Sequence, residues 1–172
     1  IVSNIAGTTR DAIDSEFENE FGKYVFIDTA GIRKKNKVEE KLEKYSVMRS
    51  LLAIERADVC LLMIDANEGV TEQDAKIVGI AHERGKGIII AVNKWDAIEK
   101  DDKTMYKYTN KIREVLSFMP YAEIMFISAL TGQRLNKIYE MIDMVIQNNS
   151  MRIQTGVLNE IVAEAVAMQQ PP

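Results

Sequence analysis

Two short apolar runs, each ended by a polar residue, constrain the fold of this 172-residue chain most strongly. Residues 59–64 read Val-Cys-Leu-Leu-Met-Ile and precede Asp65, and residues 87–92 read Gly-Ile-Ile-Ile-Ala-Val and precede Asn93. Runs of this length and composition are typical of strands that are buried on both faces of a parallel sheet. Such strands need helices on both faces of the sheet to cover them.

Helical patterns alternate with these strands along the chain. Apolar residues at helical spacing indicate helices over about 39–56, 103–118, 135–147 and 158–166, and Thr71 with Asp74 predicts the start of a helix that Gly85 ends. A further strand is expected over 122–127, and Gly22-Lys23 between two short runs is interpreted as the turn of a hairpin. This order predicts an α/β fold with a doubly wound, mostly parallel sheet and helices on both faces.

Polar residues stand where four of the expected strands end, namely Asp28, Asp65, Asn93 and Ser128. In open α/β sheets, ligands bind beyond the carboxyl ends of the parallel strands. The sequence therefore predicts a ligand site at this edge of the sheet.

The segment Asn93-Lys94-Trp95-Asp96 follows a buried strand and has the chemistry to recognise guanine. Guanine presents a ring N–H and an exocyclic amine side by side, and the carboxylate of Asp96 can accept both, whereas adenine would place an acceptor against it. Asn93 can bond the other edge of the purine or tie neighbouring loops together, and the Lys94 stem can lie along the base. The alternative is a strand-to-helix loop in which Asp96 is a helix cap.

Three other segments have chemistry that suits a nucleotide. Asp28-Thr29-Ala30-Gly31 offers a carboxylate that can hold a water of hydrated Mg²⁺ and a glycine whose N–H can approach a phosphate. Backbone N–H groups of Ser128-Ala129-Leu130 could contact the carbonyl oxygen of the base. One hydroxyl of Thr8-Thr9 could ligate Mg²⁺. Each is weak alone, but their order along one sheet edge is improbable by chance.

This order resembles the translation-factor-related, Era-like GTPases, and the match is closer to the Der (EngA) family of bacterial proteins with two tandem GTPase domains and a KH-like domain. The stretches that carry the resemblance are Ala6-Gly7-Thr8-Thr9-Arg10-Asp11, Asp28 to Lys35, Glu43-Lys44-Tyr45-Ser46, Ala53 to Asp58, and the tail from Leu158 to Pro172. Residues 1–149 resemble the second GTPase domain, and residues 150–172 resemble a linker and the first helix of the KH-like domain. A GTPase domain would precede them in the same chain.

The resemblance implies an enzyme that binds GTP and GDP with Mg²⁺, hydrolyses GTP and assists assembly of the large ribosomal subunit. Thr9, rather than Thr8, would bind Mg²⁺, Asp28 would hold the ion through water, and Gly31 would sense the γ-phosphate, so that Thr9 and Gly31 serve catalysis. Asn93, Lys94 and Asp96 would bind guanine, with Ser128 and Ala129 behind it.

Two departures from the family pattern modify these expectations. The phosphate-loop sequence Gly-x-x-x-x-Gly-Lys-Ser/Thr does not occur in the 172 residues, and in the family it lies just upstream with its strand and helix. These residues alone are therefore expected to bind GTP weakly, to hydrolyse it negligibly, and to be unstable because a central strand is missing. Ile32 stands where Ras-like enzymes have a glutamine, which resembles the GTPases assisted by K⁺.

Composition limits the other functional classes. The net charge of −4 disfavours a protein that coats DNA or RNA. The single cysteine fits a reducing compartment, and the sequence has neither a membrane-spanning stretch nor a leader, so the cytoplasm is expected. The basic run from Arg33 to Lys37 could contact ribosomal RNA or be a solvated loop. Two alternatives to the GTPase are a nucleotide-independent module that binds RNA or protein, and an ATP-using α/β protein, which Asp96 disfavours.

Overall fold

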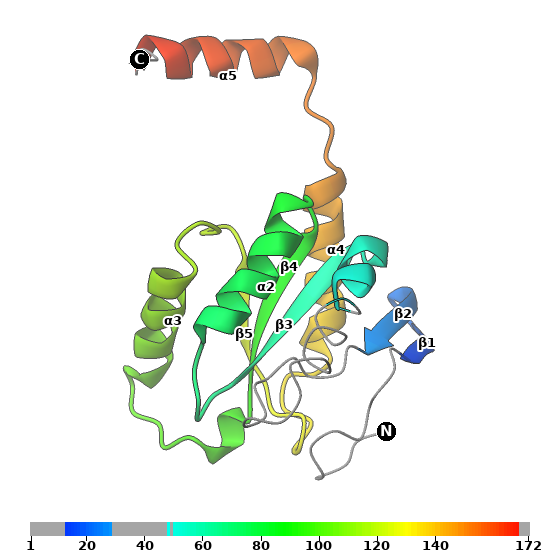
Figure 1. Ribbon diagram of the computed structural model, residues 1–172, viewed down its shortest axis with the longest axis vertical. Helices are drawn as coiled ribbons and strands as arrows, with labels where there is room; N and C mark the ends of the chain where they lie inside the picture. The colour runs from blue at the N-terminus through cyan, green and yellow to red at the C-terminus, as the bar shows by residue number, and fades with distance from the viewer. Residues whose placement is uncertain (1–12, 29–47, 49, 169–172) are drawn as a thin grey trace.

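The computed structural model describes residues 13–28, 48 and 50–168, and its strands form two sheets (Figure 1). The larger sheet is parallel and has the order β3-β4-β5, with β3 at Val59–Asp65, β4 at Gly87–Asn93 and β5 at Glu123–Phe126. The smaller sheet is an antiparallel hairpin of β1, Ile13–Asn19, and β2, Gly22–Asp28. All five strands were expected from the sequence, with ends that differ by a few residues.

The helices alternate with the strands, as predicted. They are α2, Glu72–Glu83; the 3₁₀ turn η1, Trp95–Ala97; α3, Thr104–Val115; α4, Lys137–Ser150; and α5, Thr155–Met168. Residues 50–56 are also helical, and the start of the helix that was expected over 39–56 lies outside the described residues.

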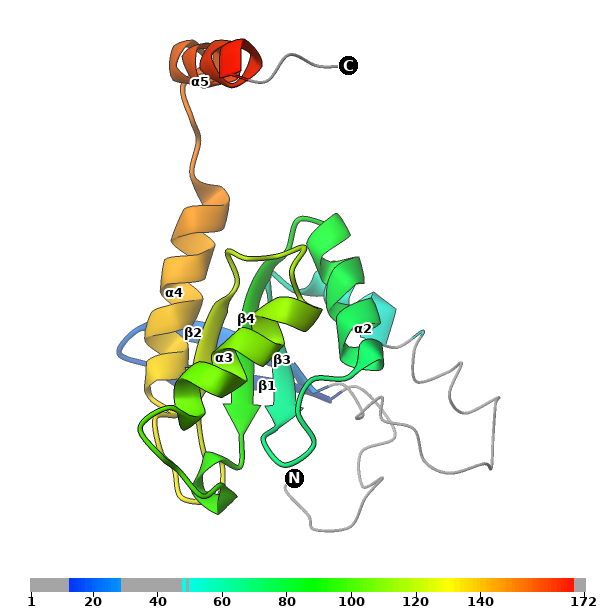
Figure 2. The ribbon, with the colours of Figure 1, turned by 90° about the vertical axis from the view of Figure 1, so that its left-hand side faces the viewer.

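The parallel sheet is covered on both faces, which confirms the doubly wound arrangement (Figure 2). Alternate residues of β4 point to opposite faces, so Ile88, Ile90 and Val92 pack with α2 and α3, whereas Ile89 and Ala91 pack with α4. Residues 87–92 are all buried, as expected of a central strand. This double burial fixes the strand and therefore the position of the residues that follow it.

The α2 helix begins and ends as its sequence predicts. The Thr71 hydroxyl accepts from the N–H of Asp74, and the Asp74 carboxylate accepts from the N–H of Thr71, which is a capping box. At the other end Gly85 has a φ of 66°, and Lys86 N–H donates to the Ala81 carbonyl over 3.1 Å, as in a Schellman motif.

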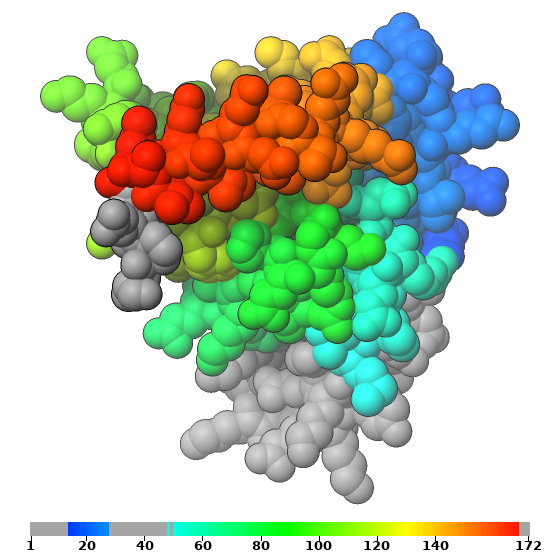
Figure 3. All heavy atoms as spheres, turned by 90° about the horizontal axis from the view of Figure 1, so that it is seen from above, coloured from blue at the N-terminus to red at the C-terminus, as the bar shows by residue number. Residues whose placement is uncertain are grey.

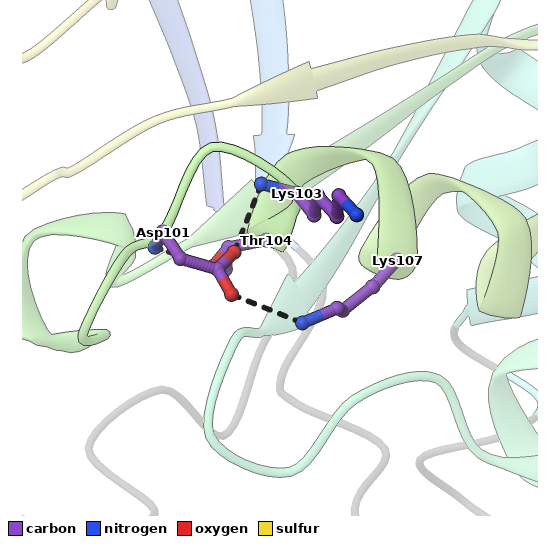
Figure 4. A network of polar contacts seen from close by, with 4 residues as sticks. All are labelled: Asp101, Lys103, Thr104 and Lys107. Carbon is purple, nitrogen blue, oxygen red and sulfur yellow. Dashed lines mark hydrogen bonds and ion pairs between the residues drawn. The ribbon is translucent and has the colours of Figure 1, made fainter.

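A carboxylate organises the start of α3 (Figure 4). The side chain of Asp101 accepts from the Thr104 hydroxyl, the Lys103 N–H and the Lys107 ammonium at 2.6, 2.9 and 3.0 Å. The hydrogen bond from Thr104, followed by that from Lys107, lowers the pKa of Asp101 to about 2. The loop that follows η1, residues 98–103, ends at this helix start.

The hairpin turn lies two residues earlier than expected. The turn residues are Glu20 and Phe21, whereas Gly22 and Lys23, the predicted turn, belong to β2 and pair with Asn19 and Glu18. The Asn19 carboxamide oxygen accepts from the N–H groups of Phe21 and Gly22, so an asparagine side chain starts the turn. Gly22 is still required, because its φ of 144° disfavours other residues.

The β1–β2 hairpin packs on α4 through aromatic rings. Tyr139 of α4 stacks on Phe17 with a centroid distance of 5.4 Å and contacts Tyr24 at 5.2 Å. The Tyr24 hydroxyl also donates to the Asp143 carboxylate over 3.1 Å. These contacts place the hairpin beside α4, on the face of the parallel sheet opposite α2 and α3.

The strands β2 and β3 lie in different sheets. Apolar side chains on both are exposed, since Val25 of β2 is 57% exposed and Met63 of β3 is 42% exposed. Whether the 172 residues are unstable on their own stays a prediction.

The α5 helix follows α4 after residues 151–154 and none of its residues is buried. Viewed from above, its side chains are exposed along its length (Figure 3). Among the described residues, no helix combines the length and the apolar character needed to cross a membrane.

Candidate guanine-binding site

The candidate site is built on the ends of the three parallel strands. Asp65 and Asn93 are register partners at the ends of β3 and β4, and Val92 is the partner of Phe126 in β5. Ile127 N–H then donates to the Val92 carbonyl, so the chain stays beside β4 up to Ser128. Three of the four strand ends singled out in the sequence are therefore neighbours at one edge of the sheet.

Asn93 ties the three strand ends together. Its backbone carbonyl accepts from the N–H of Ala66, after β3, and its side-chain oxygen accepts from the N–H of Ala129, after β5, each over 2.9 Å. Of the two roles considered for Asn93, the structure shows the tie between loops. Because the oxygen of its amide is used in this way, the NH₂ group is the part that can donate to the acceptor edge of a purine.

Trp95 anchors the loop that carries the site. Its side chain is only 3% exposed and packs on Phe126 and Tyr108 at centroid distances of 4.4 and 5.1 Å. The backbone N–H of Trp95 donates to the Ile127 carbonyl over 3.0 Å, and the Tyr108 hydroxyl donates to the Ala66 carbonyl over 2.8 Å. The buried indole and these hydrogen bonds together hold the residues on either side of Trp95 against the sheet and α3.

Asp96 is presented on the surface by this anchor. It is exposed, lies in the first turn of η1 and, within the described part of the chain, has no hydrogen bond or ion pair. No side chain caps η1, so the alternative that Asp96 acts as a helix cap is not what the structure shows. A carboxylate without a partner keeps both oxygens free to accept from a ligand.

Lys94 has an unusual backbone conformation and a defined partner. Its φ of 60° is in the left-handed region, which costs a non-glycine residue free energy and is often found at functional sites. Its ammonium group lies 2.7 Å from the Asp65 carboxylate. Burial alone would raise the pKa of Asp65, but the hydrogen bonds from Lys94 and Asn67 outweigh it and lower the pKa.

Ser128 and Ala129 lie beside Asn93 but differ in exposure. Ser128 is fully buried, and its hydroxyl accepts from the Thr131 N–H over 3.1 Å, so it shapes the turn. Ala129 is exposed, and its N–H already donates to Asn93. A contact between that N–H and a base carbonyl would therefore have to be shared with Asn93.

The residues expected to contact Mg²⁺ and phosphate lie outside the described residues, apart from the backbone of Asp28. Thr9, Thr8 and Gly31 lie outside the described residues, as does the basic run from Arg33 to Lys37. Asp28 is the last residue of β2, so its backbone is at a strand end as predicted, but its side chain is outside the description. The roles of these residues stay predictions.

Two contributors to the site were missed in the sequence. Asp65 was recognised only as a polar strand end, and Trp95 was named only as part of its motif, with no structural role. The signal for Asp65 was its place at the end of a buried strand next to the one that ends in Asn93. No sequence pattern indicates the rings that surround Trp95, because they come from α3 and β5.

Comparison with known proteins defines the class of this chain. The family model MMR_HSR1, described as "50S ribosome-binding GTPase", matches residues 1–94. The chain belongs to this family of GTPases. The parallel sheet with helices on both faces is the corresponding fold.

Within that class, the resemblance to the Der family is confirmed. The chain is 71% identical to GTPase Der of Agathobacter rectalis and 70% identical to GTPase Der of Lachnoclostridium phytofermentans, in both cases over all 172 residues. It spans 39% of the length of each relative.

A solved structure also matches. The fold is similar to that of Era in complex with MgGDPNP and a fragment of 16S ribosomal RNA, with a TM-score of 0.69 and 32% sequence identity. The match covers 83% of this chain and 46% of that one.

Proposed function

We propose that the intact protein binds GTP and GDP, and that this chain supplies the part that selects guanine. The observation that carries the proposal is the Asp96 carboxylate, which is exposed and has no partner among the described residues. It follows a buried strand and an anchored Trp95, so its backbone is held in place. Two acceptor oxygens presented from such a backbone suit the two adjacent donors of guanine and oppose adenine.

The other residues of the site have roles that fit this function. Asn93 would donate its NH₂ group to the purine, and the Lys94 stem would lie along the base. Ser128 and Ala129 would form the wall behind the base carbonyl. Their placement around the end of β4 supports these roles.

We further propose that the intact protein hydrolyses GTP with Mg²⁺. Thr9 and Asp28 would hold the ion, directly and through water, and Gly31 would contact the γ-phosphate. Mg²⁺ would neutralise charge on the phosphates. The name of the matching family and the MgGDPNP bound to Era support this activity.

The phosphate loop is absent from the sequence of these 172 residues. Most phosphate contacts in such proteins come from that loop. We therefore propose that these residues alone bind GTP weakly and hydrolyse it negligibly, and that the intact protein supplies the missing contacts.

The partner we propose is the large ribosomal subunit or its RNA, in the cytoplasm. The description of the family as 50S ribosome-binding supports it. Era is found with 16S ribosomal RNA, which belongs to the small subunit, so that structure supports contact with ribosomal RNA in general. The greater length of the Der relatives supports further domains in the intact protein, and we propose that they are a preceding GTPase domain and a following KH-like domain. In that arrangement residues 1–149 are the GTPase domain, and residues 150–172 lead into the next.

A nucleotide-independent module that binds RNA or protein remains the second candidate. The exposed apolar residues of α5, including Leu158 and Ile161, favour contact with another surface. Such a module would bind its partner equally well with and without nucleotide. A GTPase switch would bind its partner differently in the GTP and GDP states.

Hydrolysis by the full-length protein tests the enzymatic proposal and the role of K⁺. With Mg²⁺ present, we expect GTP turnover at least about tenfold faster in KCl than in NaCl at equal ionic strength, because K⁺ would replace the missing glutamine in stabilising transition-state charge. Equal rates in the two salts would remove K⁺ from the mechanism. No GTP turnover in either salt would contradict the enzyme and favour the binding module.

A further inference from the structure

Asp65 lies outside the guanine-binding motif, but its carboxylate contacts Lys94, which belongs to that motif. It is the last residue of β3, and its side chain is only 10% exposed. One carboxylate oxygen accepts from the backbone N–H and the side-chain amide of Asn67, at 2.9 and 3.1 Å. The other oxygen lies 2.7 Å from the ammonium of Lys94. A largely buried carboxylate of this kind is held in one orientation by its own loop.

Lys94 depends on this carboxylate for its position. Its side chain is 60% exposed, and a long side chain that is this exposed ordinarily samples many rotamers. Its backbone is left-handed, which directs the stem differently from the residues of the strand before it. The Asp65 carboxylate fixes the far end of the stem, while β4 fixes the near end.

We infer that Asp65 is a positioning residue. Its ion pair with Lys94, from the end of the neighbouring strand, orients the Lys94 stem for the base before the base binds. The inference rests on the proposed guanine-binding function. By holding the side chain before the ligand arrives, the ion pair lowers the entropy lost on binding. Asp65 itself would not touch the nucleotide.

The alternative is that Asp65 only stabilises the loop after β3. Its contacts with Asn67, together with the hydrogen bonds from the N–H groups of Glu68 and Gly69 to its backbone carbonyl at 3.1 and 2.8 Å, organise that turn. A loop role predicts an effect on stability that does not depend on Lys94. A positioning role predicts an effect on nucleotide binding that disappears when the Lys94 ammonium is absent.

A double-mutant cycle in the full-length protein separates the two roles. The variants are Asp65→Asn, which keeps the size and one acceptor, Lys94→Met, which keeps the stem, and the double variant. The affinity and dissociation rate of fluorescent GDP are measured for each, together with thermal unfolding. The exposed Asp102→Asn is the matched control, because it makes the same change of charge away from the strand ends.

We expect Asp65→Asn to weaken GDP binding about tenfold, mainly through faster dissociation, and Asp102→Asn to leave it unchanged. In the Lys94→Met background, Asp65→Asn should have no further effect. An equal loss in both backgrounds, or no loss in either, would overturn the inference while leaving guanine binding intact. If the unmodified protein bound no GDP, the proposed function would fail, and the inference with it.

Discussion

Replacement of Asp96 by Asn is expected to lower the affinity of the full-length protein for GDP about a hundredfold and to raise its affinity for xanthosine diphosphate by a similar factor. The carboxylate would accept from two donors of guanine, whereas the amide of Asn offers one acceptor and one donor. Xanthine has a carbonyl where guanine has an amine, so it matches the amide. Competition of each nucleotide against fluorescent GDP measures both affinities and therefore the change in preference.

The control for this prediction is Glu99→Gln, which makes the same change of charge three residues away on the same exposed loop. It should alter neither affinity by more than about twofold, since exposed charges contribute little. If Asp96→Asn and Glu99→Gln behaved alike, Asp96 would not be the residue that contacts the base. The structural reason for the expected difference is that the Trp95 anchor fixes Asp96.

Replacement of Trp95 by Ala is expected to have the largest effect on stability. We expect the free energy that is needed to open the sheet locally to fall by about 3–5 kcal/mol. The side chain is almost completely buried between Phe126 and Tyr108, and its removal leaves a cavity that these rings cannot fill. Hydrogen exchange of the β4 amides in the full-length protein measures this opening without requiring the whole protein to unfold in one step.

Two further variants sharpen the test of Trp95. Trp95→Phe keeps part of the ring packing and should lose less than half as much, whereas Tyr106→Ala removes a ring that is 68% exposed and should change little. We also expect Trp95→Ala to weaken GDP binding, because Asp96 is no longer held. If Trp95→Ala changed the free energy of opening of the β4 amides by less than about 1 kcal/mol, the indole would not be the anchor of the loop.

The sequence was sufficient for the parts of the fold that depend on local pattern. The strands β3 and β4 were predicted because an apolar run that is buried on both faces has few alternatives, and α2 was predicted from Thr71, Asp74 and Gly85. The three segments at the ends of these parallel strands were expected to be neighbours because parallel topology requires it. That expectation led to Asn93 and the Ser128-Ala129 loop, which the structure joins by a hydrogen bond.

Features that depend on tertiary contacts could not be predicted. The hairpin turn was placed at Gly22-Lys23 because glycine favours turns, but the Asn19 side chain starts the turn earlier. The ion pair between Asp65 and Lys94 joins residues 65 and 94 of the chain, and only the register of β3 on β4 brings them together. The role of Asn93 was left open because its amide has an acceptor oxygen and a donor NH₂ group, so the side chain can accept from a backbone N–H or donate to a purine.

The competition between GDP and ADP for the unmodified full-length protein, in the presence of Mg²⁺, tests the central claim most directly. The account predicts that GDP binds at least about a hundredfold more tightly than ADP, because adenine would bring an acceptor against the Asp96 carboxylate. Equal affinities, or a preference for ADP, would contradict it.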